Sequence, residues 1–241
     1  MFDFDDAIWM TEGKKQVSRK IEMSAMIFAG NEYLAEFASS YNKNVVIVPT
    51  TIDTEKLFPL NQPPEKFTIG WIGTETNFEY LKTIYQPLKI FLSANKETRL
   101  MIVSSHLPDF LKIDNGQMIF KQWEAEKENQ YINQFSIGIM PLTDTEWTRG
   151  KCSYKMLQYM ACGKPVVASP VGVNNKLFRE AEIGIPAKTG DEWIRAFTRL
   201  KSDSVFFKTC AENGRALVEK DYSIDTYHPL ILSYFKRISR Q

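Results

Sequence analysis

Residues 150–174 read GKCSYKMLQYMACGKPVVASPVGVN, and this segment decides the fold class. Lys151, Lys155 and Gln158 recur at helical spacing, so on a helix they form one polar stripe, while the apolar residues among them supply the opposite side. The glycine of the following Gly-Lys-Pro sequence ends the helix, and its proline prevents continuation. The segment therefore predicts an amphipathic helix with two lysines near its first turn.

A short apolar strand is expected directly after this helix. Residues 166–168 (VVA) have the length and character of a strand in a parallel sheet, and residues 169–174 form a loop at its carboxyl end. Ligands of open α/β sheets bind at that edge. The first turn of a helix also exposes N–H groups and the positive end of the dipole. Together with the lysines, these features predict a diphosphate site.

Composition limits the classes of partner. With 30 Lys and Arg against 29 Asp and Glu, the chain has no global basic field, so we expect no nucleic-acid partner. No apolar run approaches the roughly 20 residues of a membrane span, and the first residues, MFDFDDAIWM, do not show the basic region followed by a hydrophobic core that is typical of a signal peptide. We expect a cytoplasmic protein, with a peripheral position at the inner membrane face left open. The spacing of the three cysteines and two histidines predicts neither a disulfide framework nor a metal site.

Three regions are predicted along the 241 residues. Residues 1–44 contain a helical pattern over 14–28 and a second helix capped by Asn31. Residues 45–66 are a linker that begins with a buried strand at 45–48.

The third region, residues 67–241, alternates strand and helix signals, which indicates βαβ units and a doubly wound parallel sheet. Its strands are expected at 67–72, 100–104, 118–120, 137–140, 166–168 and 183–186. Its last three helices are expected at 191–200, 204–220 and 224–238.

The ordered set VPTTID, IGWIGT, FKQW, IGIMPL and GKCSYKMLQYMACGKPVVASPVGVN resembles the C-terminal, donor-binding half of a GT-B glycosyltransferase of the retaining family four type (glycosyl transferases group 1). The resemblance covers residues 45–238 and implies an α/β, Rossmann-like domain. Residues 1–44 resemble a remnant of the N-terminal domain. The expected protein partner is the missing remainder of the N-terminal half, or a second copy of the chain in a homodimer.

The resemblance also implies which residues form the donor site. The diphosphate would contact Gly73, Thr74, Lys151, Lys155, Val171 and Gly172. The base and ribose would contact Lys121, Gln122, Trp123 and Gln158. The donor sugar would contact Gly150, Cys152 and Ser153. No catalytic residue is assigned, and neither a metal nor a cofactor is expected beside the nucleotide-diphosphate sugar.

The chain departs from the family pattern at one motif. Family members have two glutamates, with seven residues between them, that contact the donor sugar and the ribose, and the matching positions here are Gly150 and Gln158. Glutamine can still bond ribose hydroxyls, whereas glycine supplies only backbone. Asp144 and Glu146 in the preceding loop could reach the sugar instead.

Each candidate also has an ordinary structural interpretation. Trp123 could be core packing, the lysines could lie on a solvated helix face, and Asn174 could cap the next helix. The preferred function is metal-independent, retaining transfer of a hexosyl group to a saccharide or lipid-linked saccharide. The alternatives are a noncatalytic nucleotide or sugar-phosphate binding module and an inactive fragment. A third alternative is a sugar-nucleotide epimerase, but the sequence offers no candidate acid and base pair for that reaction.

Overall fold

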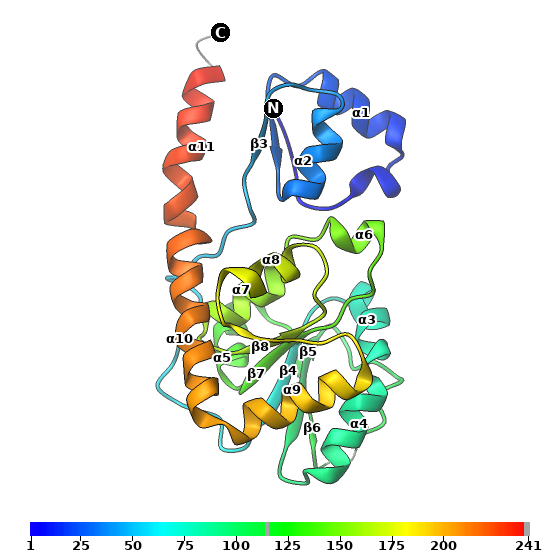
Figure 1. The fold of residues 1–241 in the computed structure, drawn as a ribbon, viewed down its shortest axis with the longest axis vertical. Coiled ribbons are helices and arrows are strands. Elements are labelled where there is room, and N and C mark those ends of the chain that lie inside the picture. Colours follow the sequence, from blue (N-terminus) through cyan, green and yellow to red (C-terminus); the bar gives the residue numbers. More distant parts are fainter. Residues whose placement is uncertain (114–115, 239–241) are drawn as a thin grey trace.

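The computed structural model describes residues 1–113 and 116–238, which build two parallel sheets (Figure 1). The small sheet has the order β1-β2-β3 and is accompanied by two helices. Its elements are β1 (Phe2–Phe4), α1 (Lys14–Glu22), β2 (Ile27–Ala29), α2 (Glu32–Ser39) and β3 (Val45–Ile47).

The large sheet has six strands in the order β6-β5-β4-β7-β8-β9, and every pair is parallel. The strands are β4 (Thr68–Ile72), β5 (Arg99–Ser104), β6 (Met118–Gln122), β7 (Ile137–Met140), β8 (Val166–Ala168) and β9 (Gly184–Pro186). The order reverses between β4 and β7. This confirms the predicted doubly wound α/β fold, with its topological switch point between those two strands.

Helices cover both faces of the large sheet, as two separate apolar clusters show. One face packs against α5 (Glu128–Asn133), α7 (Tyr154–Ala161), α8 (Val173–Glu180) and part of α10 (Ser204–Asp221). The other packs against α3 (Phe78–Thr83), α4 (Tyr85–Ala94) and α9 (Gly190–Ser202). Both faces of the strands are therefore buried, as expected for a parallel sheet.

The last helix, α11 (Ile224–Ile238), continues the column of α10 and rises beside the small sheet (Figure 1). The break between the two helices is held by Ile52, whose N–H donates to Tyr222 O at 2.8 Å and whose carbonyl accepts from Ile224 N at 3.0 Å. Higher up, the rings of Phe28 and Tyr234 meet edge to face at 5.7 Å. In the described ranges, none of the helices combines the length and apolar character needed to cross a membrane.

Two expectations about residues 1–48 were wrong. The helical pattern over 14–28 ends at Glu22, because the chain turns and Ile27–Ala29 pairs with both neighbours as the middle strand of the small sheet. The strand expected to be buried at 45–48 is instead the edge of that sheet, where Ile47 is 38% exposed. The link between the sheets thus begins after β3.

The small sheet contacts the large unit through the first turn of α2. Asn31 caps α2 as predicted, with its side-chain oxygen accepting from Leu34 N at 3.0 Å. Its amide nitrogen donates to Gly150 O at 2.8 Å and to Cys152 Sγ at 3.3 Å. Cys152 in turn donates to Asp5 O at 3.2 Å. One buried side chain therefore joins the two units.

Two strand glycines allow rings to lie directly on the large sheet. A Cβ added at Gly70 in β4 would coincide with the ring of Phe135, and one at Gly138 in β7 would coincide with that of Tyr159. Both rings are fully buried. Gly70 is therefore a packing residue in the middle of its strand.

We predict that Gly70→Ala lowers the free energy of unfolding by about 1–3 kcal/mol or more, because overpacking forces Phe135 from its place. Urea unfolding measures this change. Gly190→Ala is the control, since its added Cβ would approach only Pro87, at 3.1 Å, at an exposed helix start. Equal stability of Gly70→Ala and the unaltered chain would contradict this packing.

Candidate functional site

A cavity of about 590 Å³ lies at the carboxyl edge of the large sheet, where β4, β5 and β6 end. The first turns of α5 and α7 complete its wall. Its lining residues are Ile72, Gly73, Thr74, Glu75, Ser105, Gln122, Trp123, Glu128, Tyr154, Lys155 and Gln158. The cavity is on the side of the sheet where open α/β folds bind ligands.

Tyr159 of α7 fixes the strands at the switch point. β4 and β7 pair at only two positions, Ile69 with Ile137 and Gly70 with Gly138. Beyond them the Tyr159 hydroxyl accepts from Ile72 N at 3.1 Å and donates to Ile139 O at 3.3 Å. Burial raises the pKa of this phenol, so it remains a neutral bridge.

The helix that carries the predicted polar stripe starts later than expected. α7 begins at Tyr154, and its N-cap Ser153 has a left-handed φ of 59° and forms no side-chain capping bond. Lys151 therefore precedes the helix, and only Lys155 and Gln158 lie on it. Because the N–H groups of a first helical turn lack intrahelical partners, this turn can bind an anion.

Lys155 lies across Gly73 at the end of β4. A Cβ at Gly73 would come within 2.7 Å of Lys155 Cε and 2.8 Å of the Trp71 ring, so the absence of a side chain lets the lysine take this position. Gly73 does not offer its N–H to a ligand, since that group donates to Val103 O at 3.1 Å. Burial, together with the nearby charge of Lys151, lowers the pKa of Lys155 to about 8. Asp6 opposes that shift.

The N-terminal segment faces both lysines. Burial raises the pKa of Asp6, and Asp5 raises it further, while Lys151 and Lys155 oppose the shift. The Lys151 ammonium also lies 5.4 Å from the centre of the Trp147 ring. Lys151 is thus held beside the cavity wall, between the two units.

A polar group that the sequence analysis missed lies at the far side of the cavity. Glu128, the first residue of α5, accepts from Gln158 Nε2 at 2.7 Å and from Trp123 Nε1 at 3.3 Å on the same oxygen, Oε1. Trp123 is 48% exposed, which excludes the core-packing interpretation. Glu128 is 30 residues from Gln158 in sequence, so no local pattern marks it.

The cavity thus brings together Gly73, Thr74, Gln122, Trp123, Lys155 and Gln158 from the predicted set. Lys121 is exposed on β6 outside this lining. Gly150 and Cys152 contact the small sheet's unit instead. A Cβ at Gly150 would lie 2.8 Å from the Ala7 backbone, so the absence of a side chain there permits the close approach of the two units.

The remaining predicted contacts lie around the start of α8: they are Ser153, Val171 and Gly172. The Ser153 hydroxyl donates to Asn174 Oδ1 at 2.6 Å, and Gly172, with φ 52°, is the N-cap of α8. The interpretation of Asn174 as that cap was wrong, since it is a buried residue inside the helix. Val171 lines a neighbouring cavity of about 400 Å³. The starts of α7 and α8 are thereby tied together.

No group of three or more His, Cys, Asp or Glu side chains within 1–113 and 116–238 is arranged to hold a metal ion.

Comparisons with known proteins agree with this architecture. The family described as "Glycosyl transferases group 1" matches residues 66–203. No curated protein sequence matches significantly.

Solved structures show the same fold at low identity. Sucrose-phosphate synthase from Thermosynechococcus elongatus has a TM-score of 0.75 at 15% identity, covering 95% of this chain and 62% of that one. Alr3699/HepE from Anabaena, solved in complex with UDP-glucose, has a TM-score of 0.74 at 12% identity, covering 94% and 68%. The C-terminal domain of the group 1 protein LpcC from Francisella tularensis has a TM-score of 0.59 at 18% identity, covering 72% and 99%. The chain thus spans less than two thirds of the synthase.

We predict that Lys155 titrates near pH 8 and that Lys151→Met raises its pKa, because a like charge is removed. Asp6→Asn should lower the pKa further, because an opposing charge is lost. Side-chain NMR of labelled lysine measures both shifts, with Lys121→Met as the distant control. A Lys155 pKa unaffected by Asp6→Asn would mean that the two units do not meet at the lysines, and one unaffected by Lys151→Met would mean that the two lysines do not interact.

Proposed function

The chain belongs to the glycosyl transferases group 1 family, and on that premise we propose that it binds a nucleotide-diphosphate sugar whose sugar is transferred to a hydroxyl acceptor. The observation that carries this proposal is the cavity at the switch point. It combines a lysine at a helix start with an exposed tryptophan and a carboxylate.

The diphosphate would lie at the start of α7. Its oxygens would accept from the free N–H groups of the first turn and from the Lys155 ammonium, which Gly73 allows to lie across the strand end. Lys151 would add a second positive charge from the edge. These groups stabilise the negative charge that develops on a leaving diphosphate, so the proposed transfer needs no metal ion.

The nucleoside would occupy the side lined by Trp123 and Glu128. The exposed indole offers a stacking face for the base, worth roughly 1–3 kcal/mol in other proteins. The Glu128 carboxylate can accept hydrogen bonds from ribose hydroxyls, and Gln158 and Trp123 fix its position. In this proposal α5 supplies the carboxylate that position 158 lacks.

The acceptor, a saccharide or lipid-linked saccharide, would enter from the side of the small sheet, where Asp6 borders the lysines. Retention at the anomeric carbon is proposed from the family resemblance. The second candidate, nucleotide binding without transfer, is favoured by one feature. Gly150 is packed against Ala7 and brings no carboxylate to the sugar.

Ligand-dependent stability tests the donor site. We expect UDP, GDP or ADP, or one of their sugar conjugates, to raise the melting temperature by about 5–10 °C at 100 times its dissociation constant. UDP-glucose comes first, because the Anabaena fold neighbour was solved with it. Lys155→Met should weaken binding roughly tenfold or more, since a charge-assisted bond is lost.

The same binding should weaken as the pH rises above 8, because the free Lys155 ammonium then loses its proton. Lys155→Met should show no such dependence, and Lys82→Met on α3 is a matched control that should bind normally. Absence of a shift with every nucleotide would contradict the donor site. Transfer is then tested separately, by release of UDP from UDP-glucose with saccharide acceptors.

We predict that Glu128→Ala weakens nucleotide binding about tenfold, because the carboxylate is lost and Trp123 and Gln158 lose their shared acceptor. Calorimetric titration with UDP and with uridine measures this, and both ligands should be affected alike. Glu126→Ala is the control, an exposed carboxylate on the same segment. Full uridine affinity in Glu128→Ala would remove Glu128 from the nucleoside site.

A further inference from the structure

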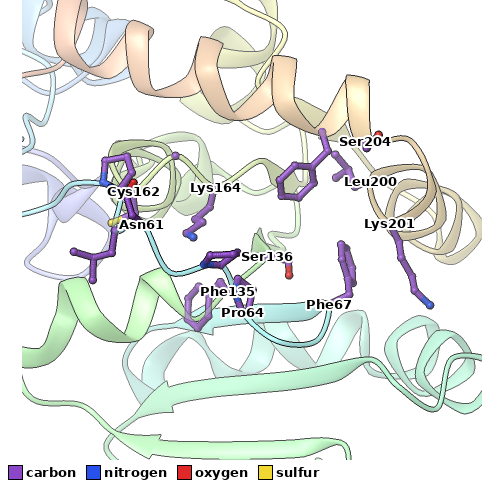
Figure 2. Close-up of a pocket in the computed structure, with 15 residues that line it drawn as sticks. Asn61, Pro64, Phe67, Phe135, Ser136, Cys162, Lys164, Leu200, Lys201 and Ser204 are labelled. Atoms are coloured by element: carbon purple, nitrogen blue, oxygen red, sulfur yellow. The ribbon is translucent and has the colours of Figure 1, made fainter.

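A second cavity, of about 710 Å³, lies at the opposite edge of the large sheet, where β4, β7 and β8 begin (Figure 2). The proline-containing link between the sheets crosses it, and the end of α9 and the start of α10 form its other wall. Its walls are largely apolar, with Pro59, Pro64, Phe67, Phe135, Leu200 and Phe207 among them. The volume is that of a small-molecule pocket.

One cation lies inside these walls. Lys164, between α7 and β8, is 9% exposed, and Figure 2 shows its side chain directed toward the link. Its ammonium donates to Asn133 O at 3.1 Å. Within the described part of the chain, no Asp or Glu forms an ion pair with it. Burial lowers the pKa of this lysine, as expected for a cation without a counter-ion.

The bond to Asn133 is the usual role of a lysine near a helix end, since it satisfies a carbonyl of the last turn of α5. That role uses one of three ammonium donors. It explains neither the open volume beside the amine nor the burial of an unpaired charge, which is costly. The hydroxyl of Ser136 also borders the cavity and accepts from Thr68 N at 3.0 Å, so its own proton is available.

The second lysine that lines this cavity, Lys201, differs from Lys164 because its charge is already paired. Lys201 stands at the rim, donates to Asn95 Oδ1 at 2.7 Å and is paired with Glu97. Figure 2 shows its side chain directed away from Lys164. The charge that an incoming ligand would meet inside is therefore that of Lys164.

We propose that this cavity is a second ligand site, which takes a small monoanion, a carboxylate carried on an apolar body. The carboxylate pairs with Lys164, and the apolar body lies against Phe67, Leu200 and the link prolines. A single lysine within apolar walls suits one negative charge better than the two of a phosphate monoester. The site is separate from the donor cavity, so each can be present without the other.

Calorimetric titration of the full chain with octanoate and with 1-octanol at pH 7 tests this site. We expect saturable octanoate binding at least tenfold tighter than that of octanol. Lys164→Gln should lower octanoate affinity at least tenfold and leave octanol unchanged, because only the charge is removed. Lys201→Gln, the control at the rim, should stay within twofold.

A second variant covers the case in which Lys164→Gln fails to fold. Phe207→Glu adds a carboxylate to a partly exposed wall position and should abolish octanoate binding. In the unaltered chain, octanoate and not octanol should shift the Lys164 side-chain NMR signal. Equal affinity for octanoate and octanol, or full octanoate affinity in folded Lys164→Gln or in Phe207→Glu, would overturn the proposal.

Discussion

The contact between Tyr159 and Gly138 is the constraint on which both cavities depend. The ring occupies the place of a glycine Cβ, and its hydroxyl bridges β4 and β7 where their ladder stops. This contact fixes the depth and rotation of α7 on the sheet. The start of the helix then presents Lys155 and Gln158 at the carboxyl edge, and its end leads into Lys164 at the amino edge. Phe135 on Gly70 seats α5 in the same way and so positions Glu128.

The fold was largely predictable from the sequence, because the central strands of the large sheet are short apolar runs between turn residues. The predicted bounds of 137–140, 166–168 and 224–238 agree with the structure. Helix starts were less predictable. The stripe of Lys151, Lys155 and Gln158 has helical spacing, yet Ser153 adopts a left-handed conformation and the helix begins after it. Periodicity cannot detect a single residue that changes direction.

The residues of the candidate site that directly follow strands were predictable from the sequence. Those that contact each other only because two helices pack together were less predictable. Gly73, Trp123 and Lys155 follow from strand ends and a helix start. Glu128 does not, because its place opposite Gln158 results from the packing of two helices. Interpretation by family position alone would record a missing carboxylate at 158. The three-dimensional arrangement places one beside it, from another helix.

Asn31 uses separate atoms to cap α2 and to contact the other unit. Its oxygen caps α2, and only its nitrogen reaches across to Gly150. If the units move apart, that nitrogen exchanges a carbonyl for water, a change of about 1 kcal/mol, while the cap stays in place. The neighbouring Lys176–Glu32 pair is exposed and adds little resistance. The start of α2 therefore stays capped whether or not the contact with Gly150 is made.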